Sequence, residues 1–304
     1  MIHYALAVLD DSERPIPAIL VDGRVHSLAS ALPGLIKDPE AGLLDIFENW
    51  EHAHAQLSDL AARLNGTGGG LCAVSKLPDD GYRRLVSKPV KMIFAGLNYY
   101  DHLRVDLGIT DFDKRAVDPL FFLKHAGAHV AAGQPIAFPK QTNKFDWELE
   151  LVAIFGHRGR AVASADAMQL VAGYTIGLDL SARDWQMSDR HMRKFDLFGG
   201  KAFDDSSPVG PWFVPAEFVD AGDLPLDLWV NGERKQHSST REMIWSTAEL
   251  IESITQHMAV EPGDMLFTGS PAGVGLFSGT FLKPGDVITA EIPGLGRIRT
   301  PVLA

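Results

Sequence analysis

Two glutamates, separated by a single residue, stand in a stretch that otherwise has the composition of a buried strand. The run FDWELELVAIFG, residues 145–156, contains Glu148 and Glu150. Alternate side chains of a strand share a face, so the two carboxylates are expected to point the same way, with about 6 to 7 Å between their Cα atoms. Apolar residues occupy positions on both faces, namely Trp147, Leu149, Leu151, Val152 and Ile154. We therefore predict two carboxylates in a strand that is apolar on both sides.

Two buried carboxylates that face one space need a positive partner. An unpaired buried carboxylate is costly, and two like charges this close would share a proton or bind a cation. A divalent ion satisfies both at once, and carboxylate oxygens are typical ligands of a hard ion such as Mg²⁺. The spacing leaves a second possibility open, which is a salt bridge to Arg or Lys from a neighbouring strand.

A third acidic residue extends the predicted cluster. Asp179 lies in the run AGYTIGLDLSARD, residues 172–184, at the end of an apolar stretch and just before a polar turn. This position is typical of a strand end that faces a cavity. Three acidic groups suit Mg²⁺ with water sites left for a substrate. Asp184 is a weaker candidate, since the adjacent Arg183 offers it a structural ion pair.

The sequence that must position these residues has two parts, which differ in the secondary structure that their apolar patterns predict. The first part mixes short strand-like runs with a helical segment from Asp45 to Leu64, and it ends near the glycine cluster GTGGG at 66–70. This cluster is predicted to be a loop, because no Gly-Lys-Ser/Thr follows it as a phosphate-binding loop requires.

The second part begins at Lys91 and contains many short β-type runs separated by Gly, Pro and Asn turns. Asn231-Gly232 is a hairpin signal, and helical patches are expected at 163–171 and from Ser246 to His257. We predict an α+β fold that is predominantly β. A small N-terminal α/β domain is expected over residues 1–88 and a larger β domain over 89–304.

The bulk composition excludes several classes of protein. The 304 residues carry 39 acidic against 28 basic side chains, a formal net charge of −11, without a Lys/Arg-rich block, so nucleic acid is not expected as a partner. The N-terminus lacks the features of a signal peptide, and no apolar stretch is long enough to span a membrane. The single cysteine, Cys72, fits a reducing compartment. A cytoplasmic protein with no membrane partner is expected.

Five sequence motifs are similar to those of one known family and occur in the expected order. They are GLNYYDH (96–102), FDWELEL (145–151), GYTIGLDLSARDWQ (173–186), GGKAFDDSSPVGPW (199–212) and LFTGSPAGVG (266–275). Between Lys91 and Val302 the chain resembles the fumarylacetoacetate hydrolase (FAH) superfamily. The resemblance implies a catalytic mixed β-roll domain, a homodimer, and Mg²⁺ or Mn²⁺ held by Glu148, Glu150 and Asp179.

The resemblance also implies roles for residues that spacing alone would leave as surface or turn positions. It implies that Lys201 contacts substrate oxygens and that His102 is the general base. The implied substrate-binding residues are Gln186, Thr268, Arg183 and Tyr99. Members that pair the histidine with a glutamate carry it three residues later, where this chain has Val105. Asp106, one residue further, would share a helical face with His102 and could serve as its catalytic partner.

These features together predict the chemistry. A divalent ion with open positions binds a 2-oxo acid through its carboxylate and adjacent carbonyl and favours an enolate. We expect hydrolysis of a C–C bond in a 2,4-dioxo acid of the acylpyruvate or fumarylpyruvate type, in the breakdown of aromatic or sugar-derived acids, with His102 activating water. Decarboxylation, hydration or isomerisation of 2-oxo acids could use the same site. Residues 104–116 could form a lid.

Three other classes compete with this hypothesis. A noncatalytic β-domain could use the acidic cluster as a structural cation site. A serine hydrolase needs a Gly-x-Ser-x-Gly turn, and TGSPAG at 268–273 has a different spacing. A zinc hydrolase is disfavoured because His125 and His129, although at helical spacing, have no acidic base between them. Both histidines are predicted to lie on the surface or in loops.

Overall fold

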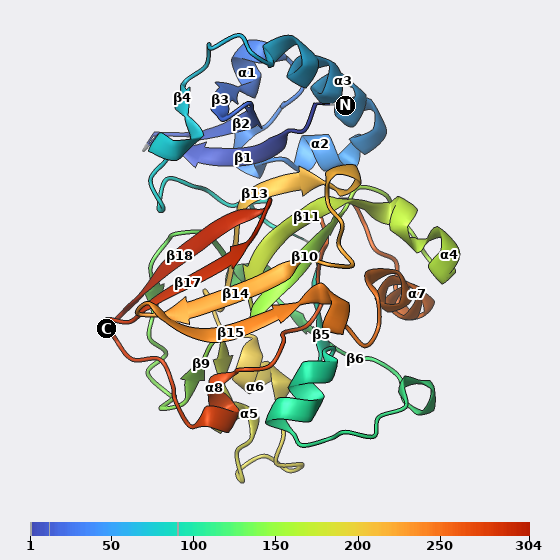
Figure 1. Cartoon of the computed structure of the whole chain (residues 1–304), viewed down its shortest axis with the longest axis vertical. Helices are drawn as coiled ribbons and strands as arrows, with labels where there is room; N and C mark the ends of the chain where they lie inside the picture. The colour runs from blue at the N-terminus through green and yellow to red at the C-terminus, as the bar shows by residue number, and fades with distance from the viewer. Residues whose placement is uncertain (1, 12, 90) are drawn as a thin grey trace.

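The computed structural model describes residues 2–11, 13–89 and 91–304, and within them the fold is a strand-rich α/β mixture (Figure 1). The strands are β1 (Ala5–Asp10), β2 (Pro15–Val21), β3 (Arg24–Ser27), β4 (Cys72–Ala73), β5 (Met92–Gly96), β6 (Leu120–Lys124), β7 (His129–Ala131), β8 (Ile136–Ala137), β9 (Phe145–Asp146), β10 (Leu149–Phe155), β11 (Val171–Leu178), β12 (Ser181–Ala182), β13 (Ser207–Pro215), β14 (Pro225–Val230), β15 (Glu233–Ser239), β16 (Met265–Phe267), β17 (Val287–Ile292) and β18 (Gly296–Leu303). The α-helices are α1 (Leu28–Ala31), α2 (Leu44–Glu48), α3 (Trp50–Leu64), α4 (Ser164–Ala167), α5 (Arg183–Gln186), α6 (Leu197–Lys201), α7 (Thr247–His257) and α8 (Gly275–Ser278). The predominantly β class predicted from the sequence is confirmed.

The described strands form one large sheet and two smaller ones. The 11-stranded sheet has the order β4-β3-β2-β1-β13-β11-β10-β16-β5-β6, with β7 paired to β13. The 5-stranded sheet has the order β15-β14-β17-β18-β8, and β9 pairs with β12. The short helices α5, α6 and α8 gather at the end of the molecule opposite the N-terminal region (Figure 1). None of the helices in the described ranges is long and apolar enough to cross a bilayer.

The N-terminal region contributes its strands to the large sheet. β1 runs antiparallel to β13, with Leu6 opposite Phe213. The segment predicted as one helix from Asp45 to Leu64 forms two helices, because α2 ends before Asn49 and α3 begins after it. The glycine cluster at 66–70 is a loop before β4, as predicted. A domain boundary at residue 88 stays a prediction.

The strand that carries the glutamates is buried on both faces, as predicted. Leu149, Leu151 and Ala153 pack into a core that includes residues of β14, β17, β18 and α7. Val152 and Ile154, on the other face, pack into a second core with residues of α2, β13 and β16. The run differs from the prediction in one respect, because it is not a continuous strand: β9 ends before Trp147 and β10 begins after Glu148.

Local sequence signals explain the elements around this core. α7 begins with a capping box, in which the Ser246 side chain accepts a hydrogen bond from the Glu249 amide and the Glu249 carboxylate accepts one from the Ser246 amide. The hairpin between β14 and β15 turns at Asn231-Gly232, and both residues have positive φ, 52° and 82°. This conformation is the one that Asn-Gly favours. Both the helix start and the hairpin were predicted from the sequence and are confirmed.

Candidate active site

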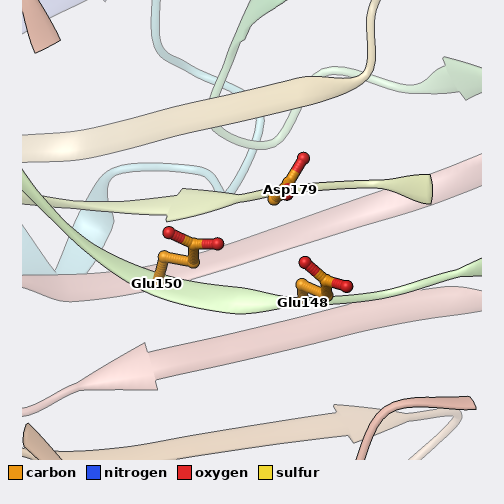
Figure 2. A group of neighbouring side chains, drawn as sticks. All are labelled: Glu148, Glu150 and Asp179. Carbon is orange, nitrogen blue, oxygen red and sulfur yellow. The ribbon is translucent and has the colours of Figure 1, made fainter. Parts of the chain in front are cut away.

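The three predicted carboxylates meet at one place in the large sheet. Glu148 precedes β10, Glu150 lies within it, and Asp179 follows the last residue of the neighbouring antiparallel strand β11. One oxygen of each residue lies within 4.8 Å of the others, and the three side chains turn towards a common space (Figure 2). Their relative exposures are 8%, 1% and 1%. The alternation of strand side chains and the antiparallel pairing therefore bring the acids together.

Basic side chains surround two of the three carboxylates. The Lys201 Nζ lies 2.6 Å from Glu148 Oε2 and 2.5 Å from Asp179 Oδ2. The Arg183 guanidinium also contacts Glu148. The Lys124 Nζ lies 2.6 Å from Asp179 Oδ1. The salt bridges that the spacing left open as an alternative are thus present at Glu148 and Asp179.

Glu150 differs from the other two acids. Its Oε2 accepts a hydrogen bond of 2.7 Å from the Gly269 amide, and within the described ranges it forms no salt bridge with a basic side chain. Burial, with the negative charges of Asp179 and Glu148, raises the pKa of Glu150 well above its usual value. Burial also opposes ionisation of Glu148, but Arg183 and Lys201 outweigh it and lower that pKa to about 2.

This charge distribution fits a divalent cation. The acidic trio offers three hard oxygen ligands in a dry space, which matches the preference of Mg²⁺ and Mn²⁺ for oxygen donors. The uncompensated negative charge lies at Glu150, where burial favours the protonated acid unless a cation is close. Lys201, Lys124 and Arg183 bring three positive charges against four buried carboxylates, Glu148, Glu150, Asp179 and Asp146, so a cation would balance the negative charge that remains. Glu148, Glu150 and Asp179 therefore form a candidate divalent-metal site.

Lys124 is a member of this site that sequence reasoning missed. It ends β6, is 3% exposed, and bonds to the carbonyls of Leu180 and Ser206 at 3.3 and 3.1 Å as well as to Asp179. Burial lowers its pKa to about 8, although Asp179 attracts its positive charge. A lysine that closes the apolar run PLFFLK was the available signal.

Asp146 was also missed, although it continues the alternation of Glu148 and Glu150 by one step. It is fully buried and accepts hydrogen bonds from the Arg183 Nε at 2.7 Å and from the Gly275 and Leu276 amides at 2.6 and 3.0 Å. It therefore links α5 to the start of α8.

The ion pair expected between Arg183 and Asp184 is not formed. Arg183 binds Asp146 and Glu148, and Asp184 accepts hydrogen bonds from the Thr142 hydroxyl and the Asn143 amide. Arg183 and Asp184 are neighbours in the sequence but bond to different groups. Arg183, the first residue of α5, contacts the buried acids, whereas Asp184 bonds to the segment at 142–143.

His102 and Asp106 lie on a short π-helical turn, η3 (His102–Asp106). The His102 Nδ1 lies 2.6 Å from Asp106 Oδ2, and this carboxylate also accepts a hydrogen bond from the Gly273 amide at 3.1 Å. Val105, at the position of the family glutamate, is 71% exposed. His102 is thus paired with the acid four residues later, Asp106, as expected. The residue three positions later, Val105, points to solvent.

A cavity of about 180 Å³ lies against some of these groups, but Glu150 and Asp106 are not among its lining residues. The polar residues that line it are His102, Glu148, Asp179, Arg183, Gln186, Lys201 and Ser270. Gln186 accepts a hydrogen bond from Arg183 at 3.0 Å. Tyr99 and Thr268 are fully buried and are not among the lining residues. The Thr268 hydroxyl donates to the Leu151 carbonyl at 2.9 Å.

The second histidine pair does not resemble a metal site. His125 is exposed, but His129 is fully buried in β7, so its predicted place on the surface or in a loop is wrong. Burial and the nearby Arg84 lower the pKa of His129 to about 3. Among the described residues, the acidic trio is the group with metal-ligand geometry.

Known proteins resemble the chain over the region that carries this site. The model of the family described as fumarylacetoacetate (FAA) hydrolase C-terminal matches residues 91–303. A Bos taurus relative, "Oxaloacetate tautomerase FAHD2B, mitochondrial", is 40% identical over 221 residues, which are 72% of this chain and 68% of the relative.

Two solved structures share the fold. Fumarylpyruvate hydrolase from Pseudomonas aeruginosa, in complex with Mn²⁺ and pyruvate, has a TM-score of 0.63 and 37% identity, over 71% of this chain and 91% of that one. Fumarylacetoacetate hydrolase from Exiguobacterium antarcticum has a TM-score of 0.78 and 25% identity, over 99% of each chain. The second likeness includes the N-terminal region. The chain belongs to the fumarylacetoacetate hydrolase family.

Proposed function

We propose that this chain is a divalent-cation-dependent hydrolase that cleaves a C–C bond in a 2,4-dioxo acid of the acylpyruvate type. The observation that carries the proposal is the His102–Asp106 pair. Its histidine lines the same cavity as Glu148, Asp179 and Lys201. A base that can activate water therefore stands beside a site suited to an anionic 2-oxo acid.

The cation, Mg²⁺ or Mn²⁺, would be held by Glu148, Glu150 and Asp179, and when bound it would supply Lewis acidity towards the carboxylate and adjacent carbonyl of the substrate. The Mn²⁺ and pyruvate in the Pseudomonas aeruginosa structure support this choice of ion and ligand class.

The other steps of the proposed reaction are assigned to side chains of the protein. His102 takes a proton from water while Asp106 accepts a hydrogen bond from the protonated imidazole, and the hydroxide attacks the carbonyl carbon at position 4. The bond between carbons 3 and 4 then breaks, its electron pair passes to carbon 3 to give the enolate of pyruvate, and the distal part leaves as a carboxylic acid. The proton held by His102 then passes to carbon 3, which gives pyruvate and restores the base. The Lys201 ammonium stabilises the growing negative charge on oxygen. Arg183 holds Gln186 and Glu148 in place.

A second candidate activity is the tautomerisation of oxaloacetate. The Bos taurus relative that is 40% identical carries this name. The reaction moves a proton between carbon 3 and the enol oxygen, and His102 could perform the transfer without attack by water. Decarboxylation and hydration would use the same enolate.

One experiment separates these activities. Purified protein is incubated with Mg²⁺ or Mn²⁺ and either a 2,4-dioxo acid or oxaloacetate. Loss of the enol absorbance is followed together with the release of pyruvate and a second acid. Hydrolysis predicts equal amounts of pyruvate and the second acid from the 2,4-dioxo acid. Conversion of oxaloacetate without cleavage of any 2,4-dioxo acid would contradict the hydrolase proposal.

The expected homodimer and cytoplasmic location remain predictions. Sedimentation of the purified protein at several concentrations would test the first, since a stable dimer keeps twice the chain mass on dilution.

A further inference from the structure

The side chains that line the active-site cavity are of two kinds: the polar ones are buried, whereas most of the large apolar ones are exposed, and we call these two sets the charged end and the apolar end. The charged end consists of the polar residues already described around Lys201 and Glu148. The apolar end is formed by side chains from four separate segments, including Leu107, Leu120, Met187, Phe195, Leu276 and Phe277. Most of these are partly exposed, so they border the open side of the cavity rather than the core.

The basic side chains that line the cavity are already engaged. Arg183 contacts Asp146 and Glu148, and Lys201 contacts Glu148 and Asp179. Within the described ranges, the apolar end has no basic residue among its lining side chains. Arg190 and Arg193 are exposed on the loop between α5 and α6 but do not line the cavity. A second carboxylate on the substrate would thus lose water without gaining a cationic partner.

We propose that the site selects 2,4-dioxo acids whose distal group is uncharged and apolar, that is, acylpyruvates with an alkyl or aryl tail. This inference rests on the proposed function and names its substrate class. The carboxylate and neighbouring oxygens of the substrate occupy the charged end, and the acyl tail lies against Leu120, Met187 and Phe277. Each methylene that leaves water there strengthens binding about threefold to fourfold.

The test begins with binding, so that its result does not depend on turnover. The probes are 2-oxooctanoate and 2-oxooctanedioate, which have equal chain length and differ by a distal carboxylate, and neither has the 4-oxo group that cleavage requires. Their dissociation constants are measured by calorimetry with Mg²⁺-loaded protein at fixed ionic strength. The monoacid is expected to bind at least about tenfold more tightly. Equal binding, or tighter binding of the diacid, overturns the proposal.

Two variants that add the same charge at different places test whether the substrate tail lies at the apolar end. Met187→Arg places a cation in the apolar end and is expected to shift the preference towards the diacid by at least about threefold. Met192→Arg adds the same charge on the same loop, at a residue that is 99% exposed and does not line the cavity, and it should leave the preference unchanged. Equal shifts in the two variants would show a general charge effect and would contradict the assigned tail site.

The corresponding 2,4-dioxo acids complete the test. Cleavage of 2,4-dioxooctanoate at a kcat/KM at least about tenfold above that of 2,4-dioxooctanedioate is expected. If neither is cleaved while the monoacid still binds more tightly, the hydrolase proposal fails and the tail preference stands. If both are cleaved with equal kcat/KM, the tail preference fails and the hydrolase proposal stands.

Discussion

The acidic trio and the His102–Asp106 pair both contribute side chains to one cavity, namely Glu148 and Asp179 from the trio and His102 from the pair, but they lie on very different parts of the fold. Glu150 lies in a central strand that is buried on both sides, and Asp179 follows the adjacent strand. The histidine pair lies on a short turn whose Val105 is 71% exposed. The candidate cation ligands are therefore held by the core of the sheet, whereas the residue proposed to move protons is held by a short turn with an exposed side.

In the proposed function, the acidic trio would determine where the ion binds, and the turn that carries His102 would determine which reaction follows. Strand residues packed on both faces have little freedom to move, so in the proposed function they would fix where a cation and a 2-oxo acid bind. A peripheral turn tolerates substitutions more easily, so we expect changes there to affect the reaction more than the binding of the ion. A family with hydrolase and tautomerase members is consistent with such a division.

The largest effect is expected from Glu150→Gln. The substitution keeps the shape of the side chain but removes the charge that lacks a basic partner, so activity should fall by at least about a hundredfold and Mn²⁺ affinity with it. Glu291→Gln, at an exposed residue of β17, is the control and should change neither. Mn²⁺ titration followed by electron paramagnetic resonance measures the affinity. Unchanged Mn²⁺ binding in Glu150→Gln would remove this residue from the metal site.

His102→Asn tests the other half of the comparison. The variant should retain Mn²⁺ affinity but lose about 10²- to 10⁴-fold in hydrolysis, because no base remains to activate water. Asp106→Asn should reduce kcat in the same direction while the dissociation constant of 2-oxooctanoate stays constant. Hydrolysis at the wild-type rate in His102→Asn would show that the peripheral turn does not supply the base.

Asp146→Asn should lower the stability of the fold, since this carboxylate bonds both to Arg183 and to the amides at the start of α8. Breaking a buried ion pair costs about 3 kcal/mol or more of the free energy of unfolding. Urea unfolding measures the loss, and KM should rise because Arg183 also positions Glu148 and Gln186. A variant as stable as the wild type would mean that Arg183 is held by its other partners alone.

The smallest effect concerns His129, the buried histidine of β7. Its pKa in the folded protein is about 3, below the unfolded value of 6.5, so the unfolded chain binds the proton first. Its contribution to stability is therefore complete above pH 6.5 and is lost as the pH falls towards 3, by about 2 kcal/mol between pH 7 and pH 5. His129→Gln should flatten this part of the pH dependence measured by urea unfolding. An identical slope in the variant would assign the dependence to other groups.

The sequence was sufficient to predict the acidic trio because the signal is local. Alternating glutamates inside an apolar run, and Asp179 at the end of another, show buried charge without any knowledge of the fold. Lys124 could not be placed in the same way. In the sheet order β10, β16 and β5 lie between β11 and β6, so Lys124 reaches Asp179 only because the sheet curves and brings the ends of these strands together, which is a product of long-range pairing.

Other departures from prediction are also long-range in origin. Asp146 was overlooked because its partners, Arg183 and the amides of α8, come from distant parts of the chain. The helix expected from Asp45 to Leu64 divides at Asn49, and residues on both sides of the break, Ile46 and Phe47 before it and Leu57 after it, pack into the second core. The spacing of apolar residues indicates which side chains are buried, whereas the position of a break in a helix depends on the distant residues that those side chains pack against.

Because β1 pairs with β13, the N-terminal region also covers the apolar layer next to the candidate metal site. Leu6, Ile19 and Phe47 belong to the same apolar layer as Val152 and Ile154, which continue the glutamate face of β10. A chain trimmed to residues 91–303, which match the family model, would let solvent into this layer and would leave the edge of β13 that faces β1 unpaired, inviting strand-to-strand association. Trimming would then raise the local permittivity and loosen the hold on the cation without altering any ligand.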